Sequence, residues 1–243
     1  MRWKCTCAFD GGAFCGWQSQ ADGSGVQDAI EKRLADVLGG AVRIHGCSRT
    51  DTGVHARRFV FHFDGVWGHG VDALLAALRT GLPGAVLVFS ARRVSGRFHA
   101  RFSSTGKRYA YYLQEGLPLP FDAPFRVASH RALDTEAMRE AATSLVGRRD
   151  FTAFSATGSR ELECAVRDLR RLEVFRRGRR IRIVVEADGF LYRMARTLAG
   201  GLIRVGEGRL PPSRLREILD SRCRTHEIPT APAHGLFLER VWY

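Results

Sequence analysis

Alternating apolar and polar positions mark the start of this chain. Residues 2–9 place four apolar side chains on one face, and a Gly-Gly pair ends the run. Such period-two alternation predicts a half-buried β-strand. Ser24, with Gln27 three positions later, predicts a capping box for a helix that Gly39 ends. The same signals predict a strand over 41–44, a strand through the alternating phenylalanines of 59–63, a helix over 72–79 and a strand over 86–89.

The second half repeats this pattern in outline. Asp134 predicts the N-terminus of a helix that Gly147 stops, and the pair Arg177-Gly178 predicts a hairpin turn. The remaining elements are expected as strands over 107–114, 167–175, 180–187 and 235–243, and as helices over 191–205 and after the Pro-Pro pair at 211–212. Each half then has the order β-α-β-β-α-β, which is the ferredoxin-like arrangement.

The expected fold class is therefore α+β. We predict two ferredoxin-like halves, 1–104 and 105–243, whose antiparallel sheets join around a central catalytic cleft. No low-complexity linker separates the halves, which favours firm packing between them.

Charge adds a candidate partner. The chain has 243 residues and a formal net charge of +13, and three lysines among its 38 basic residues leave 35 arginines. Arginine presents a planar fork of donors that suits phosphates and stacks on bases, so a polyanionic partner such as RNA is expected. The alternative is a GC-rich genome, which raises arginine content without any functional need.

The cysteines indicate a reducing compartment. Six cysteines are scattered without Cys-x-x-Cys spacing, which favours free thiols in a cytosolic protein. A zinc site built from Cys5, Cys7, Cys47 and His45 is the alternative, although it lacks the usual ligand spacing. Strand-like sequence begins almost at once, leaving no room for a signal peptide, and no run approaches the ~20 apolar residues of a membrane span. We expect a cytoplasmic protein with no membrane partner.

The loop over 46–56 carries the candidate chemistry. It holds Arg49, Asp51 and Gly53 between two apolar runs, and Gly53 is expected to supply a turn with positive φ that aims Asp51 into the catalytic cleft. Taken alone, Arg-Thr-Asp is weak evidence, because Thr and Asp ordinarily serve turns and helix caps.

Other segments make this loop part of a larger pattern. Together with it they resemble pseudouridine synthases of the TruA type, in the same order along the chain. The matching segments are Phe9-Asp10-Gly11-Gly12 with Gly16-Trp17-Gln18, Phe98-His99-Ala100-Arg101-Phe102-Ser103 with Lys107-Arg108-Tyr109, Phe190-Leu191-Tyr192-Arg193-Met194-Ala195-Arg196, and Ala231-Pro232-Ala233-His234-Gly235-Leu236. The resemblance implies an isomerase that converts uridine to pseudouridine at positions 38, 39 and 40 of the anticodon stem-loop of tRNA.

The resemblance also implies residue roles. Asp51 would be the indispensable catalytic carboxylate, and Arg196 would offset the cost of keeping it ionised in a water-poor pocket. Tyr109 would stack on the uracil, Leu236 would close the pocket as an apolar wall, and Arg49 would enter the space left by a flipped-out nucleotide. An ionised Asp51 could attack the sugar carbon or the base, or assist deprotonation of the sugar.

Each of these residues also has a structural interpretation. Arg196 could lie on a solvated helix face, Tyr109 and Leu236 could be plain core residues, and Arg49 could stabilise the turn by a hydrogen bond. His55 and His99 are interpreted as structural or RNA-facing.

The resemblance implies no metal and no organic cofactor, and a homodimer that binds one tRNA across both subunits. Two alternatives remain: a synthase of the same fold acting on other RNA positions, and a non-catalytic ferredoxin-like RNA-binding module. The usual aromatic signature of that module is absent from this sequence.

Overall fold

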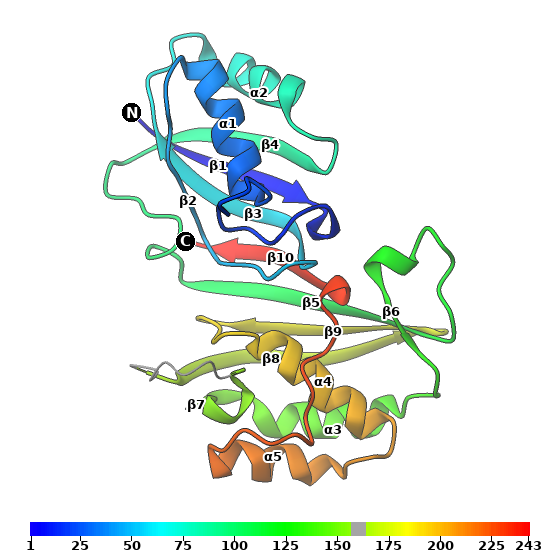
Figure 1. Cartoon of the computed structure of the whole chain (residues 1–243). Coiled ribbons are helices and arrows are strands. Elements are labelled where there is room, and N and C mark those ends of the chain that lie inside the picture. Colours follow the sequence, from blue (N-terminus) through cyan, green and yellow to red (C-terminus); the bar gives the residue numbers. More distant parts are fainter. Residues whose placement is uncertain (157–163) are drawn as a thin grey trace. The chain divides into compact units, whose positions relative to one another are not determined.

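The computed structural model of the chain describes residues 1–156 and 164–243, and it is of mixed α and β type (Figure 1). The described residues include five α-helices. The chain packs as two compact units, one made of Met1–Thr105 with Phe237–Tyr243 and the other of Gly106–Leu236.

The first unit is built on antiparallel strands. Strand β1 lies between β3 and β4 and is antiparallel to both, β2 pairs with β3 in the antiparallel sense, and β10 pairs with β3 in parallel. Its elements are β1 (Arg2–Phe9), α1 (Val26–Leu38), β2 (Ile44–Gly46), β3 (His55–Asp64), α2 (Gly70–Gly81), β4 (Val86–Val94) and, from Phe237 on, β10 (Leu236–Trp242), with a 3-10 turn η1 (Gly11–Ala13).

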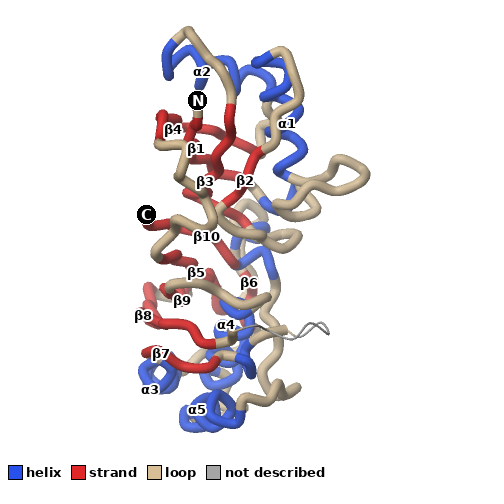
Figure 2. Tube along the Cα trace, turned by 90° about the vertical axis from the view of Figure 1, so that its left-hand side faces the viewer, coloured by secondary structure: helices blue, strands red, loops and turns tan. Residues whose placement is uncertain are grey.

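The core of this unit lies between the strands and α1. The burial of β1 alternates along its whole length, as predicted, and its inward face carries Trp3, Cys5, Cys7 and Phe9. Helix α1 lies beside these strands (Figure 2). Its buried residues include Ile30, which is 0% exposed. Removing apolar side chains of this size from water is the main stabilising contribution to such a core.

The predicted capping box of α1 is wrong. The helix begins at Val26 with Gly25 as its N-cap, and the Asp28 carboxylate accepts hydrogen bonds from the Gly25 and Gln20 N–H groups at 2.9 and 3.0 Å. Ser24 instead donates its hydroxyl hydrogen to Asp22 at 2.6 Å. An ionised carboxylate accepts these bonds better than a Gln27 amide, and it also suits the positive end of the helix.

The C-terminus of α1 is as predicted, with Gly39 in the left-handed conformation at φ 75°. The strand expected over 41–44 begins only at Ile44. Strand β3 differs from a half-buried strand because it is buried on both faces from Phe59 to Phe63. Its second face is covered at His62 by the segment 98–100, whose Ala100 N–H donates to His62 Nδ1 at 3.1 Å.

The second unit has its own strands and three helices. Its strands follow the order β5-β9-β8-β7 with antiparallel neighbours, and β6 pairs with β5 in parallel. Helix α3 packs against β8, α4 and α5. The elements are β5 (Gly106–Glu115), η2 (Ala123–Phe125), β6 (Val127–Ser129), α3 (Thr135–Leu145), β7 (Gly147–Asp150), η3 (Thr152–Phe154), β8 (Val166–Arg177), β9 (Arg180–Ala187), α4 (Met194–Gly206), α5 (Pro212–Ser221) and η4 (Ala233–Gly235).

Local signals in this unit are mostly confirmed. Asp134 caps α3 by accepting two backbone N–H groups at 2.9 and 3.0 Å, and Gly178 forms the β8–β9 turn at φ 58°. Helix α3 ends at Leu145, and Gly147 starts the unpredicted strand β7, which carries no apolar alternation. Helix α4 starts later than expected because Arg193 adopts a left-handed conformation at φ 57° before it.

The six cysteines are free thiols, and three of them are buried. Cys5, Cys7 and Cys47 are buried without a disulfide, and burial raises the pKa of Cys5 to about 12. In the described ranges, no group of three or more His, Cys, Asp or Glu side chains is placed to hold a metal ion, which contradicts the alternative of a zinc site. None of the described helices combines the length and the apolar character needed to span a bilayer.

His62 should make the folded state sensitive to acid. Burial, and then the nearby His99, lowers the pKa of His62 to about 4. Because this imidazole is harder to protonate in the folded chain than in the unfolded chain, stability is lost as pH falls from about 6.5 towards 4. The loss between pH 7.5 and pH 5 should be about 2 kcal/mol.

This expectation is tested by urea unfolding at both pH values. His62→Gln keeps an acceptor for the Ala100 N–H and removes the titrating ring, so its loss over the same interval should be smaller by about that amount. Equal losses in the two proteins would contradict the assignment to His62.

Candidate active site

Backbone hydrogen bonds hold the loop that carries Asp51. The Trp17 N–H donates to Thr50 O at 3.1 Å, and the Val54 N–H donates to Asp51 O at the same distance. Gly53 donates to Gly11 O at 3.2 Å and has φ 80°, which confirms the predicted turn. The loop is thus attached on both sides of Asp51, whose side chain is half-buried.

Two glycines allow the turn over 11–17 to approach this loop closely. A Cβ placed on Gly11 would lie 2.0 Å from Val54 O, and one placed on Gly16 would lie 2.8 Å from Thr50 O. Gly16 also has φ 85°, a conformation that other residues adopt only with strain. The sequence signal of these glycines was visible, but their contact with the Asp51 loop was not.

Contacts between aromatic rings also hold the turn over 11–17 and the Asp51 loop. The ring of Trp17 is buried and stacks on Phe59 at a centroid distance of 3.9 Å. His55 is 1% exposed, accepts the Gly11 N–H at Nδ1 (3.0 Å) and stacks on Phe237 at 4.6 Å. His55 is therefore structural, which decides between the two interpretations given to it above.

A cavity adjoins the other side of the turn. It has a volume of about 570 Å³, and its lining includes Phe14, Lys32 and Thr52. Helix α1 therefore does not fill the space behind the turn. The N-terminus of α1 still contacts the turn, because the Val26 and Gln27 N–H groups donate to Gly16 O and Trp17 O at 3.1 and 2.9 Å.

Arg49 is exposed two residues before the carboxylate. Within the parts of the chain that the structure describes, its side chain makes no hydrogen bond and no ion pair. The interpretation of Arg49 as a turn-stabilising residue is therefore wrong, and its guanidinium faces solvent beside Asp51.

In the second unit, one segment connects several of the predicted residues. Arg196 Nε donates to Ala231 O at 2.8 Å, and the Tyr111 hydroxyl donates to Pro232 O at 2.8 Å. A Cβ on Gly235 would lie 2.9 Å from Tyr111 Cζ, so the segment also passes close over this ring. Arg196 is thus anchored to the segment over 231–235 and does not lie on a plain solvated helix face.

Tyr111 is a residue to which the sequence assigned no functional role. Burial raises its pKa, against the opposing effect of the positive charge on Arg196. A neutral hydroxyl is the form that can donate to Pro232, so burial and the hydrogen bond support each other. Its position two residues after Tyr109, on the same strand face, was the available signal.

Tyr109 and Leu236 both lie in buried positions. Tyr109 is 6% exposed and meets the ring of Phe190 edge-on at 5.0 Å, while Leu236 is 4% exposed at the start of β10. Arg49 and Asp51 belong to the first unit, and Tyr109, Arg196 and Leu236 belong to the second. Chemically, the first unit offers a fixed carboxylate, and the second offers a guanidinium, a phenol and an apolar wall.

Comparison with known proteins identifies close relatives. A family model described as tRNA pseudouridine synthase matches residues 141–243. The tRNA pseudouridine synthase A of Thiobacillus denitrificans is 40% identical over 236 residues, covering 97% of this chain and 90% of the relative. The protein of the same name from Afipia carboxidovorans is 40% identical over 250 residues, covering 100% and 99%. The one from Clostridium acetobutylicum is 33% identical over 241 residues, covering 99% and 98%.

Gly16→Ala should destabilise the protein more than Gly23→Ala. Both glycines have positive φ, so each substitution should cost about 1–2 kcal/mol of conformational strain. A Cβ on Gly23 meets nothing within 4 Å, whereas one on Gly16 collides with Thr50 O. The collision should add about 1–3 kcal/mol.

The free energy of unfolding in urea measures both variants. Equal losses would show that the Thr50 contact is not a constraint and that the Asp51 loop is free to shift.

Proposed function

The chain belongs to the tRNA pseudouridine synthase A family, and from this premise we propose that it converts uridine to pseudouridine at positions 38, 39 and 40 of the anticodon stem-loop of tRNA. The family makes the chain an isomerase. The observation that carries the proposal is the identity of about 40% with these enzymes over nearly the whole chain. Such identity favours catalysis over a non-catalytic RNA-binding module.

The proposed mechanism gives Asp51 the central role. The uracil is detached from its ribose and reattached through carbon, and each route open to a carboxylate requires Asp51 in its ionised form. The backbone contacts of the first unit support this role, because a fixed carboxylate loses little orientational freedom on reaction.

The second unit would contribute the groups around the base. In the proposal, the Arg196 guanidinium keeps Asp51 ionised, Tyr109 stacks on the flipped uracil and assists proton movement at its carbon, and Leu236 excludes water. Burial of Tyr109 and Leu236 and the anchoring of Arg196 to Ala231 support these assignments, because each side chain is held in one place.

We also propose that each half of the chain is ferredoxin-like and that the two sheets join around the catalytic cleft, with halves close to 1–104 and 105–243. The support in the first unit is its element order β1-α1-β2-β3-α2-β4, with antiparallel β1–β3, β1–β4 and β2–β3 pairs. Residues 237–243 would be shared with the first half, since they pack in its unit.

The partner and setting follow from the same premise. The net charge of +13 and 35 arginines support tRNA as the polyanionic partner. Action in the cytoplasm, a homodimeric state and a reaction without metal or organic cofactor are parts of the proposal that rest on the family resemblance.

Asp51→Asn should abolish pseudouridine formation. The substitution keeps the side-chain volume and removes the charge, so turnover should fall on the order of 10⁴-fold or more. Binding of tRNA should stay close to that of the unmutated protein. The assay is mapping of pseudouridine at positions 38–40 in a tRNA transcript at excess enzyme.

Asp72→Asn is the matched control, because it makes the same charge change at an exposed position on α2. It should leave product formation unchanged. Measurable single-turnover product from a folded Asp51→Asn protein would remove this carboxylate from the mechanism.

Arg49→Ala should slow the reaction on structured RNA without abolishing it. If Arg49 fills the space of the flipped nucleotide, its loss should cost a few kcal/mol, or roughly 10- to 100-fold in rate. The loss should shrink on a tRNA whose target uridine faces an abasic site, because little unpairing is then needed.

Arg43→Ala serves as the control, since it removes a comparably exposed arginine that pairs with Glu31. An Arg49→Ala defect of equal size on the paired and the abasic substrates would contradict a role in base flipping.

A further inference from the structure

A row of basic and titratable side chains crosses the strands of the first unit. In the strand register, Arg92 of β4 faces Lys4 of β1, Lys4 faces His62 of β3, and His62 faces His45 of β2. Directly opposed residues of neighbouring strands project from the same face of a sheet. We call these four residues the basic row.

The basic row lies on one face of the sheet, and the side chains that contact the Asp51 loop lie on the other face. Along β3, His62 alternates with Phe61 and Phe63, and on their face Phe59 stacks on Trp17, which donates to the Asp51 loop. The basic row is therefore separate from the candidate active site.

Lys4 and Arg92 are directly opposed cations, whereas the buried His62 is neutral at neutral pH because its pKa is lowered to about 4. Like charges directly opposite each other on a sheet repel. Burial, and then the charge of Arg92, lowers the pKa of Lys4 to about 8. The carboxylate of Asp64, at the end of β3, already pairs with Arg2, which donates two hydrogen bonds to it at 2.9 and 2.6 Å. A bound anion would relieve this repulsion.

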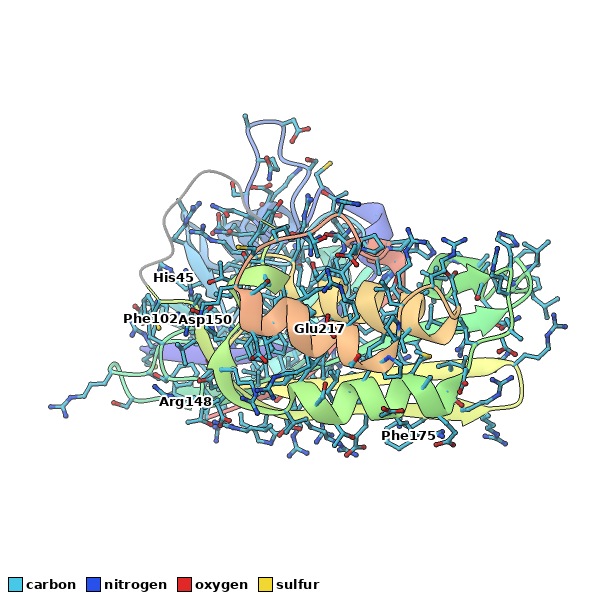
Figure 3. All side chains as sticks on the ribbon, turned by 90° about the horizontal axis from the view of Figure 1, so that it is seen from below. His45, Phe102, Arg148, Asp150, Phe175 and Glu217 are labelled. Atoms are coloured by element: carbon cyan, nitrogen blue, oxygen red, sulfur yellow. The ribbon has the colours of Figure 1, made fainter. Side chains whose placement is uncertain are left out.

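Beside the row lies a rigid loop with exposed aromatic surface, Arg97–Phe102, which we call the aromatic loop. Phe102 is 77% exposed, and its ring lies 4.4 Å from His99, which in turn lies 5.5 Å from His45 and 4.7 Å from His62. Figure 3 shows Phe102 and His45 near each other at the edge of the molecule.

Hydrogen bonds fix the aromatic loop. His99 Nδ1 accepts the N–H groups of Arg101 and Phe102 at 3.1 and 3.3 Å, and the Tyr243 hydroxyl donates to Ala100 O at 2.8 Å. The backbone under Phe102 is therefore held in place. A fixed, exposed ring loses little entropy when a partner stacks on it.

The charged side chains of the sequence stretch that contains the aromatic loop are all basic. The sequence contains no Asp or Glu from residue 73 to residue 114, and the exposed arginines of this stretch include Arg92, Arg93, Arg97 and Arg101. The Arg101 guanidinium lies 5.7 Å from the Phe102 ring centroid. Arginines next to an open aromatic ring are the combination that binds single-stranded nucleic acid, through phosphates and stacked bases.

We propose that the exposed Arg92 of the basic row and the aromatic loop together form a second RNA-binding surface, which contacts tRNA outside the stem-loop that holds the reacting uridine. Its arginines would bind backbone phosphates, and Phe102 would stack on an unpaired base. This inference rests on the proposed function for the identity of the RNA. Charge complementarity favours RNA, and a single exposed ring offers too little apolar area for insertion into a membrane.

The test compares full-length tRNA with a minimal anticodon stem-loop. Phe102→Ala should raise the Kd and KM for full-length tRNA about tenfold at unchanged kcat. The double variant Arg97→Glu with Arg101→Glu should also weaken binding, and should reduce the slope of log Kd against log salt by about 2. For the minimal stem-loop, both variants should have the same Kd, KM and kcat as the unmutated protein.

Matched controls are Phe121→Ala, whose ring is 89% exposed in the second unit, and Arg148→Glu with Arg177→Glu, two exposed arginines of that unit. These control variants should have the same affinity as the unmutated protein for both full-length tRNA and the minimal stem-loop. Equal losses on tRNA and stem-loop, unchanged tRNA affinity, or equal losses in the controls would each overturn the proposal. Loss of binding to vesicles of anionic lipid, with RNA affinity intact, would overturn it in favour of a membrane surface.

The outcomes separate this inference from the proposed function. If the unmutated protein forms no pseudouridine, the proposed function fails, while the Kd comparison for tRNA still decides the second surface. If pseudouridine forms and the variants bind tRNA normally, only the second surface fails.

Discussion

Direct backbone packing between the turn over 11–17 and the loop over 50–54 is the constraint on which the candidate active site depends. At Gly11 the two segments are so close that a Cβ would lie 2.0 Å from a carbonyl oxygen. No side chain can be inserted there, so the loop cannot relax towards the turn. The first turn of helix α1 holds the same turn, because the Val26 and Gln27 N–H groups donate to Gly16 O and Trp17 O at 3.1 and 2.9 Å. A catalytic carboxylate placed in this way depends on glycines far from it in sequence.

In the second unit, side-chain hydrogen bonds as well as a close glycine contact hold the segment that lies next to the candidate site residues. Arg196 and Tyr111 donate to neighbouring carbonyl groups of one segment, at Ala231 and Pro232. A backbone hydrogen bond from the Ala231 N–H to Arg196 O at 3.1 Å fixes the same segment before the short turn η4. A guanidinium that is already bound through Nε keeps its remaining donors in a defined direction, which suits a role in stabilising a carboxylate.

Elements with a strong local signal could be predicted from the sequence, and the others depend on contacts that the sequence does not display. The alternation of β1, the Asp134 cap and the turns at Gly53 and Gly178 follow from local chemistry, and the structure confirms them. The capping box failed because Asp28 outcompetes the Gln27 amide, a choice that pattern matching cannot weigh. Strand β7 and the covered second face of β3 depend on tertiary packing. For the site, Asp51 and Gly53 were visible as a motif, but the closeness of Gly11 and Gly16 to it was not.

The packing of residues 237–243 with the first unit has a consequence for how the chain is made. Strand β10 pairs with β3 at Phe237 and His55, and Tyr243 binds Ala100, so the first unit is completed by residues made more than 130 positions after Thr105. The second unit is continuous in sequence and has all its residues earlier. During synthesis on the ribosome, the second unit can therefore finish folding before the first, although the first emerges sooner. Until then the edge of β3 at His55 and Ala56 lacks its partner strand, and an unpaired strand edge in a nascent protein is open to wrong strand pairing.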